Sequence, residues 1–230
     1  REERNDREFL LNFLSNDNMQ ILPKNLHLLS DNDTNFSRSK EKKFKNLANL
    51  LINNNINESL LFELKLLLEK TGKIDQYIYS LIQGKFLLII KNHKGSKIFQ
   101  KYLKLTHCEI IHKIFIELSY NLEELIADSY ANYFCKKFFV FLNQKDRIDF
   151  LKGIEKSLIK LSCDSIGTYP IQTIIEHVGS KNEKIILINA LKDHIEQLAY
   201  DPFGSHVLEE LLTCFEANYI IFIYEFFSDN

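Results

Sequence analysis

Four pairs of hydrogen-bonding side chains recur along this chain, and the members of each pair stand four residues apart. The pairs are Ser96 and Gln100, Asn132 and Lys136, Thr168 and Gln172, and Ser205 and Glu209. On a helix, residues i and i+4 share one face, so each pair presents two polar ends side by side. A planar or cationic residue directly follows the first member of each pair: Lys97, Tyr133, Tyr169 and His206. Such triplets fit unstacked nucleobases, because the pair can hydrogen-bond a base edge while the middle side chain lies against the base face.

The triplets recur at an almost constant interval. A small residue precedes each one, and these residues are Gly95, Ala131, Gly167 and Gly204, at intervals of 36, 36 and 37. A fixed period of this length indicates a solenoid, in which each repeat buries its apolar face against its neighbours. Three residues before each small residue stands Asn92, Asp128, Asp164 or Asp201. We expect these side chains to accept hydrogen bonds from the free amides at the start of each triplet helix.

Each repeat is predicted to contain three helices. A short apolar helix comes first, at residues 86–90, 122–126, 158–161 and 195–198. The triplet helix follows, and a third apolar helix closes the repeat, at residues 110–118, 148–154, 184–191 and 218–227. Pro170 is compatible with a helix that begins near Gly167, since amides of the first turn have no intrahelical partner. The sequence therefore predicts an all-α solenoid whose four repeats cover about residues 77–112, 113–148, 149–184 and 185–230.

Residues 1–76 lack the triplet pattern and are predicted to form a helical cap over the exposed end of the solenoid. Within them, residues 1–14 carry an amphipathic helical pattern, and the polar stretch 30–43 is predicted to be a mobile loop. Two further helices are expected at residues 57–69 and 73–82, where they would form a degenerate first repeat.

The composition supports a helical protein and disfavours several classes. Hydrophobic residues make up 45% of the 230 residues, Trp is absent, and only 3 Pro and 7 Gly occur, so a turn-rich β-architecture is not expected. The longest apolar runs, at 86–90 and 220–223, are far too short to span a bilayer. The sequence contains no nucleophile–histidine spacing, glycine-rich phosphate loop or His-Glu-x-x-His motif, so we expect neither an enzyme nor a bound cofactor.

The cysteines and the charges say less about function. No Cys-x-x-Cys motif occurs, and three of the four cysteines stand in apolar stretches, so we expect reduced thiols that fill the core. His107, Cys108 and His112 supply too few convergent ligands for zinc, and no metal is expected. The net charge of −2 favours no partner. Locally, the first two motifs are surrounded by Lys94, Lys97, Lys101, Lys104, Lys136 and Lys137, and the last two by Glu176, Glu209 and Glu210.

Residues 78–230 resemble the PUF (Pumilio-homology) family of repeat proteins. Gly95 to Gln100 and Gly167 to Gln172 match the family's Gly-small-aromatic/basic-x-x-Gln core, and Ala131-Asn132-Tyr133 is similar to its Gly-Asn-Tyr version. The resemblance implies a right-handed, curved α-solenoid similar to armadillo and HEAT arrays. It covers four repeats, where the family usually has eight, so the chain is expected to be the N-terminal half of a longer array.

The resemblance also implies which base each repeat reads. Ser96 with Gln100 resembles the family's adenine pair, and Thr168 with Gln172 looks like a variant of it. Ser205 with Glu209 resembles the guanine pair, because a carboxylate accepts from guanine N1–H and N2–H₂. Asn132 would go with Gln for uracil, but Lys136 has donors and no acceptor, so the base at that repeat stays open. Since the family binds RNA antiparallel to the chain, the implied partial site is 5′-GA(U?)A-3′.

From this resemblance we expect a monomeric, cytoplasmic protein that binds single-stranded RNA in mRNA 3′ untranslated regions. It would repress translation or promote mRNA decay by recruiting protein co-repressors, without membrane attachment. Two alternatives stay open. One is a PUF-like scaffold in ribosome biogenesis that binds structured RNA with little base specificity. The other is an α-solenoid that binds protein and no RNA.

Overall fold

The computed structural model describes residues 58–229. The chain divides into two units, residues 1–63 and 64–230, and the repeats all lie in the second unit. The amphipathic helix predicted at residues 1–14 and the loop predicted at 30–43 lie outside the described residues.

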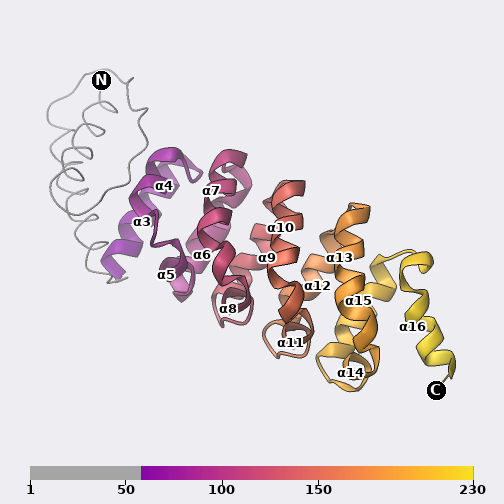
Figure 1. Cartoon of the computed structure of the whole chain (residues 1–230). Coiled ribbons are helices and arrows are strands. Elements are labelled where there is room, and N and C mark those ends of the chain that lie inside the picture. The colour runs from indigo at the N-terminus through magenta and orange to yellow at the C-terminus, as the bar shows by residue number, and fades with distance from the viewer. Residues whose placement is uncertain (1–57, 230) are drawn as a thin grey trace, which may run out of the picture. The chain divides into compact units, whose positions relative to one another are not determined.

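The described residues form helices connected by short turns, with no strand among them (Figure 1). Two helices precede the repeats, α3 (Glu58–Thr71) and α4 (Gln76–Ile82), close to the two that the sequence predicts. The short first helices of the repeats are α5 (Phe86–Ile90), α8 (Leu122–Ile126), α11 (Leu158–Ser162) and α14 (Ile195–Tyr200). The second helices are α6 (His93–Tyr102), α9 (Ala131–Phe141), α12 (Thr168–His177) and α15 (Gly204–Cys214). The third helices are α7 (Cys108–Leu118), α10 (Gln144–Ile154), α13 (Lys181–Leu191) and α16 (Ala217–Asp229).

Four three-helix units follow one another, as the sequence predicts, and we number them 1 to 4. Unit 1 covers residues 86–118, unit 2 residues 122–154, unit 3 residues 158–191 and unit 4 residues 195–229. The predicted repeat bounds near residues 113, 149 and 185 fall inside the third helices α7, α10 and α13. Periodicity fixes the length of a repeat but not where it starts, which is why the observed units begin about nine residues later than the predicted ones.

Short 3₁₀ helices extend the longer ones. They are η1 (Leu103–Leu105), η2 (Ser119–Asn121), η3 (Glu155–Ser157) and η4 (Lys192–His194). The last three join the third helix of one unit to the first helix of the next, so consecutive units follow without a long loop.

The start of every second helix is set by the predicted Asn or Asp. The side-chain Oδ1 of Asn92 accepts from the amides of Lys94 and Gly95, at 2.9 and 3.2 Å. Equivalent pairs of bonds of 2.7–2.9 Å reach the oxygens of Asp128, Asp164 and Asp201. Each cap therefore satisfies two amides that have no intrahelical partner, which confirms its predicted role. Pro170 lies in the first turn of α12, as predicted, where a missing amide is tolerated.

The small residue of each motif allows the second helix to approach the end of the first. A Cβ atom added to Gly95 would lie 2.1 Å from the carbonyl oxygen of Ile89. At Gly167 and Gly204 the added atom would lie 2.7 and 2.9 Å from the carbonyl oxygens of Leu161 and Leu198. These separations are too short for a methyl group, so the close contact of the two backbones requires glycine in these three units.

A continuous apolar core runs between the layers of helices. Phe86 of α5 contacts Phe99 of its own unit and Phe134 of unit 2, with ring centroids 4.9 and 5.5 Å apart. Phe134 in turn stacks on Phe138, and Phe139 meets Phe150 edge to face at 5.3 Å. The contact between Phe86 and Phe134 joins unit 1 to unit 2, so the first unit buries part of its apolar face against its neighbour.

Polar bridges reinforce the layer of third helices. Arg147 on α10 forms an ion pair with the buried Glu183 of α13 at 2.9 Å and donates to the His177 carbonyl. Lys184 on α13 pairs with Glu216 of unit 4 at 2.6 Å, and His112 on α7 lies 2.9 Å from the buried Asp146 of α10. In Figure 1, α10 and α13 lie in front of α9 and α12.

All four cysteines are free, and their environments differ. Burial raises the pKa of the Cys135 thiol to about 12. Burial and a hydrogen bond to Glu210 raise the pKa of Cys214 to about 11. These two groups are therefore protonated and unreactive at neutral pH. Cys163 is half-buried, whereas Cys108 is exposed and does not fill the core. No helix in the described part of the chain combines the length and hydrophobicity needed to cross a membrane.

The close contact at Gly95 gives a first prediction. Gly95→Ala should lower the free energy of unfolding by about 1–3 kcal/mol, because the new methyl group must push α6 away from the Ile89 carbonyl. Thermal unfolding followed by circular dichroism measures the effect. Gly179→Ala is the matched control, since nothing lies within 4 Å of a Cβ at that position. Equal melting temperatures for the two variants would contradict the assigned role of Gly95.

Candidate nucleic-acid interface

The four triplets lie in one row on the second helices. These helices pack side by side in chain order, with α6 against α9, α9 against α12 and α12 against α15. Because the Asn or Asp cap and the small residue recur at the same spacing before each triplet, the triplets occupy equivalent places along the row. The middle residues Lys97, Tyr133, Tyr169 and His206 are all solvent-accessible. Tyr133 and Tyr169 keep 54% and 56% of their surface accessible, so their rings are available to a partner.

The first residue of the triplet is placed differently from the expectation. Ser96 and Thr168 are buried, with 2% and 1% of their surface exposed. Ser96 Oγ donates to the Tyr130 carbonyl of unit 2 at 2.7 Å, and Thr168 Oγ1 donates to the Phe203 carbonyl of unit 4 at 3.1 Å. Each hydroxyl therefore holds the turn of the following unit.

The same hydroxyls also orient the residue four positions later. Gln100 Nε2 donates to Ser96 Oγ at 2.9 Å, and Gln172 Nε2 donates to Thr168 Oγ1 at 2.9 Å. Each glutamine is partly exposed, so the rest of its amide can meet a ligand. In units 1 and 3 the structure thus brings the predicted pair together, with the glutamine at the surface and the hydroxyl beneath it.

Unit 2 departs from this arrangement. Asn132 is buried, and its Nδ2 donates to the Asp128 carbonyl at 2.8 Å within its own unit. The Nζ of Lys136 lies over the rings of Tyr133 and Tyr169, 5.4 and 5.8 Å from their centroids.

Unit 4 presents a carboxylate. Ser205 Oγ donates to the Pro202 carbonyl at 3.3 Å, and Glu209 Oε2 lies 3.2 Å from His206 Nδ1. An ionised carboxylate only accepts hydrogen bonds, so Glu209 cannot donate to the serine as Gln100 and Gln172 do. Ser205 is also more exposed than Ser96 or Thr168.

Charge changes sign along the row. The second helices of units 1 and 2 carry exposed lysines: Lys94, Lys97, Lys101 and Lys137. Those of units 3 and 4 carry Glu176, Glu209 and Glu210 instead. A polyanion laid along the row would therefore meet its attractive charges at units 1 and 2.

Two features of this surface were missed at the level of sequence. The hydroxyl-to-carbonyl bonds that Ser96 and Thr168 form between units were not predicted. The small hydroxyl residue after the glycine is no sufficient signal, because Ser205 follows Gly204 in the same way and bonds within its own unit. Tyr130 was also missed, which is 44% exposed with its ring 5.3 Å from that of His93. It lies one residue before the motif's small residue, where no other unit has a polar aromatic side chain.

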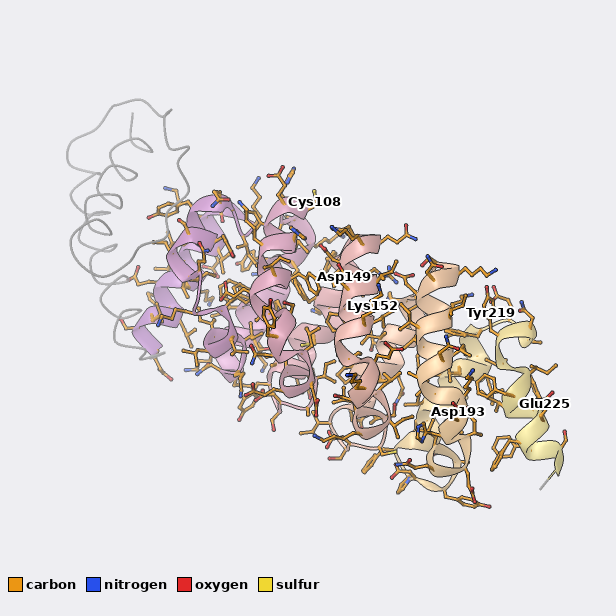
Figure 2. All side chains as sticks on the ribbon, in the orientation of Figure 1. Cys108, Asp149, Lys152, Asp193, Tyr219 and Glu225 are labelled. Carbon is orange, nitrogen blue, oxygen red and sulfur yellow. The ribbon has the colours of Figure 1, made fainter. Side chains whose placement is uncertain are left out.

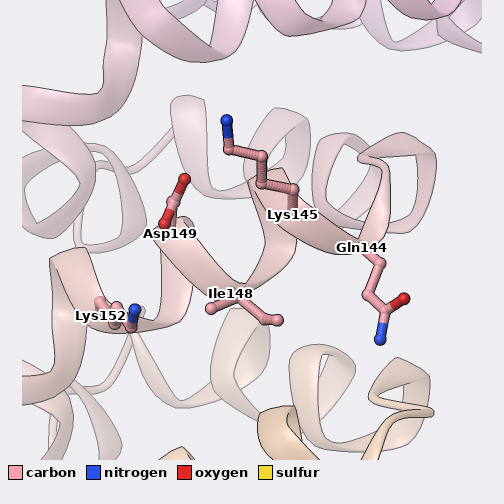
Figure 3. Close-up of a pocket in the computed structure, with 5 residues that line it drawn as sticks. All are labelled: Gln144, Lys145, Ile148, Asp149 and Lys152. Atoms are coloured by element: carbon pink, nitrogen blue, oxygen red, sulfur yellow. The ribbon is translucent and has the colours of Figure 1, made fainter.

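Among the described residues, the third helices form no comparable site. Figure 2 labels Cys108, Asp149, Lys152, Tyr219 and Glu225 on third helices and Asp193 on η4, and these side chains spread along the array without converging. A hollow along α10 is lined by Gln144, Lys145, Ile148, Asp149 and Lys152 (Figure 3). All five come from one helix, so the hollow lacks polar groups converging from several elements. Among the residues that the structure describes, no group of three His, Cys, Asp or Glu side chains could hold a metal ion.

Comparison with known proteins connects this row of helices to other repeat proteins. The Pumilio-family RNA binding repeat matches residues 157–192 and 194–225, which correspond to units 3 and 4. Pumilio homolog 12 of Arabidopsis thaliana is 30% identical over 166 residues, which cover 71% of this chain and 28% of that protein. The Pumilio domain-containing protein C6G9.14 of Schizosaccharomyces pombe is 29% identical over 146 residues, which cover 64% of this chain and 21% of that protein. The chain thus spans less than a third of the length of either relative.

Solved structures agree with the fold. The Puf4 RNA binding domain bound to the HO endonuclease RNA 3′ UTR recognition sequence has a TM-score of 0.61 and 28% identity, over 67% of this chain and 46% of that one. PUF-8 in complex with PBE-RNA has a TM-score of 0.66 at 18% identity, over 82% of this chain and 54% of that one. The second likeness concerns the fold alone.

The inter-unit hydroxyl bond yields a second prediction. Thr168→Val keeps the shape of the side chain but leaves the Phe203 carbonyl and the Gln172 amide without their partner. We expect the free energy of unfolding to fall by about 1–3 kcal/mol, as for other buried polar groups left unpaired. Thr173→Val is the control on the same helix, because its hydroxyl only donates to the Tyr169 carbonyl one turn back. Denaturant titration compares the two, and a loss no larger than that of the control would contradict the bridging role.

Proposed function

This chain belongs to the PUF family of α-helical repeat proteins, and on that premise we propose that it binds single-stranded RNA sequence-specifically through the row of second helices. One observation carries the proposal. At equivalent places on four stacked helices, a solvent-accessible planar or cationic side chain stands beside a hydrogen-bonding end group. Unstacked bases need both a surface to stack on and polar groups along their edge.

Following the family resemblance, we propose a base for each of three units. Gln100 and Gln172 are held by the hydroxyls beneath them, and each keeps the donor and acceptor capacity that the proposed adenine contact needs. Glu209 offers acceptors only, which suits the N1–H and N2–H₂ donors of guanine. With the RNA antiparallel to the chain, the proposed partial site is 5′-GA(U?)A-3′, in which unit 2 faces the third base.

The biological role is also a proposal, and it is supported by the relatives. The solved neighbours include Puf4 and Puf3 domains bound to 3′ UTR recognition sequences. We propose that this protein binds such sequences in mRNA in the cytoplasm and represses translation or mRNA stability by recruiting partners. The family relationship supports binding rather than catalysis.

A mobility-shift assay tests this function directly. The chain should retard a short single-stranded RNA containing GAUA and should bind a scrambled RNA of equal composition more weakly. Equal retention of both RNAs, or a preference for a structured RNA, would favour the ribosome-biogenesis scaffold. The absence of any shift with RNA would favour a solenoid that binds protein.

Stacking provides a third prediction. Tyr169→Ala should weaken binding of the GAUA RNA by about 1–3 kcal/mol, the usual range for a base–aromatic stack. The melting temperature should barely change, because the ring is 56% exposed. Tyr120→Ala is the control, since Tyr120 is 93% exposed on η2, outside the row. A variant that loses stability but not affinity would identify Tyr169 as a packing residue.

The base preference of unit 4 provides a fourth prediction. Glu209→Gln restores an amide that can donate to Ser205, as Gln100 does to Ser96. The preference at the first base of the site should move from guanine toward adenine, by about 1–3 kcal/mol of discrimination if the edge contact is bidentate, as in DNA readout. Competition binding with GAUA and AAUA measures the change. Glu210→Gln removes the same charge one residue along and should leave base choice as it is. An unaltered preference in Glu209→Gln would refute the assignment of this unit.

A further inference from the structure

Lys136 is the only member of the four pairs whose end group lies over aromatic rings in the described contacts. Its Nζ is 5.4 Å from the centroid of Tyr133 on its own helix and 5.8 Å from the centroid of Tyr169 on α12. Both separations are within the range of about 6 Å over which a cation and a ring face attract each other. The ammonium group therefore occupies the space between the middle residues of units 2 and 3.

That space is where a base would stack. Tyr133 and Tyr169 are the stacking residues of adjacent units, and both rings are exposed. Glutamine at the equivalent position in units 1 and 3 donates back to the hydroxyl beneath it. Unit 2 has no such hydroxyl, and its Asn132 is buried and donates to the Asp128 carbonyl. The lysine side chain consequently extends over the rings.

We propose that Lys136 fills the base-binding space between Tyr133 and Tyr169 in the free protein and must be displaced before a base can stack there. The inference rests on the proposed RNA-binding function. A base entering this space separates the ammonium from both ring faces, and that loss offsets part of the stacking gain. Unit 2 thereby becomes the position of the row that discriminates least between bases. Lys136 lowers the specificity of this unit because it occupies the space that a base would enter.

The test compares two lysines on one helix. Lys136→Gln and Lys137→Gln each remove one positive charge, but Lys137 is exposed and lies one residue further along. Binding to four RNAs containing GANA, with N as each base, is measured by fluorescence anisotropy. Raised salt is used because the lost charge then contributes least. Lys136→Gln should bind about 2–5-fold more tightly than the wild type, the factor corresponding to one exposed cation–ring contact. It should also acquire a preference for uracil as N.

Lys137→Gln should bind equally or more weakly than the wild type. If Lys136→Gln weakens binding as well, Lys136 contacts the RNA and the proposal is overturned. If tightening occurs without any gain in base preference at N, the claim about discrimination is overturned while displacement stands.

A second measurement does not depend on affinity. In the free protein, the ε-methylene protons of Lys136 should be shifted upfield in the NMR spectrum by the ring currents of the two tyrosines. Tyr133→Leu and Tyr169→Leu should each reduce that shift, and adding the GAUA RNA should abolish it. Unshifted protons in the free protein would overturn the proposal, as would a shift that persists in the bound protein. If the wild type binds none of the RNAs, the proposed function fails, and the free-state spectrum still decides whether Lys136 fills the space.

Discussion

The close contact between the end of each first helix and the start of each second helix is the constraint on which the rest of the structure depends. At Gly95, Gly167 and Gly204 there is no room for a Cβ atom against the preceding carbonyl oxygen. The Asn or Asp three residues earlier holds the amide of the same residue. Together these contacts fix the position of the first turn of the second helix against the end of the first helix. Since the triplet follows at once, its direction is determined by backbone packing, and the four triplets align because the same contact recurs.

At two junctions between units, the same hydroxyl takes part in the packing and in the orientation of a side chain that we propose to contact RNA. Ser96 and Thr168 donate across to the next unit, and each accepts from the glutamine that faces the surface. The spacing of two units and the orientation of the amide are therefore set by one hydroxyl. Ser205, in the last described unit, donates to Pro202 in its own turn instead. A change at Ser96 or Thr168 is therefore expected to affect both the packing of two units and the orientation of the glutamine.

Much of the fold could be predicted because the signals are local. The caps, the close glycines and the apolar runs identify the helices, and the short first helices at 86–90 and 122–126 agree residue for residue with the structure. The start of each repeat could not be obtained from a period alone. At the site, i and i+4 spacing correctly brought Ser96 and Gln100 together. The burial of Ser96 depends on the Tyr130 carbonyl of another unit, and the direction of Lys136 depends on Tyr169. Neither contact could be predicted from the sequence of a single helix, because each one joins two units.

The positively charged residues and the hydrogen-bonding end groups are distributed differently along the row. A single strand brings one phosphate with each nucleotide, so attraction is strongest where the lysines of α6 and α9 gather and weakest beside the glutamates of α12 and α15. The hydrogen-bonding end groups are distributed otherwise, since unit 2 replaces an amide with an ammonium and unit 4 has a carboxylate that only accepts. If RNA runs along the row as proposed, the lysines of units 1 and 2 attract its phosphate backbone. Unit 2 then discriminates little between bases. Selection of bases then falls mainly on units 1, 3 and 4, and in units 3 and 4 each base contact must form without help from a nearby cluster of cations.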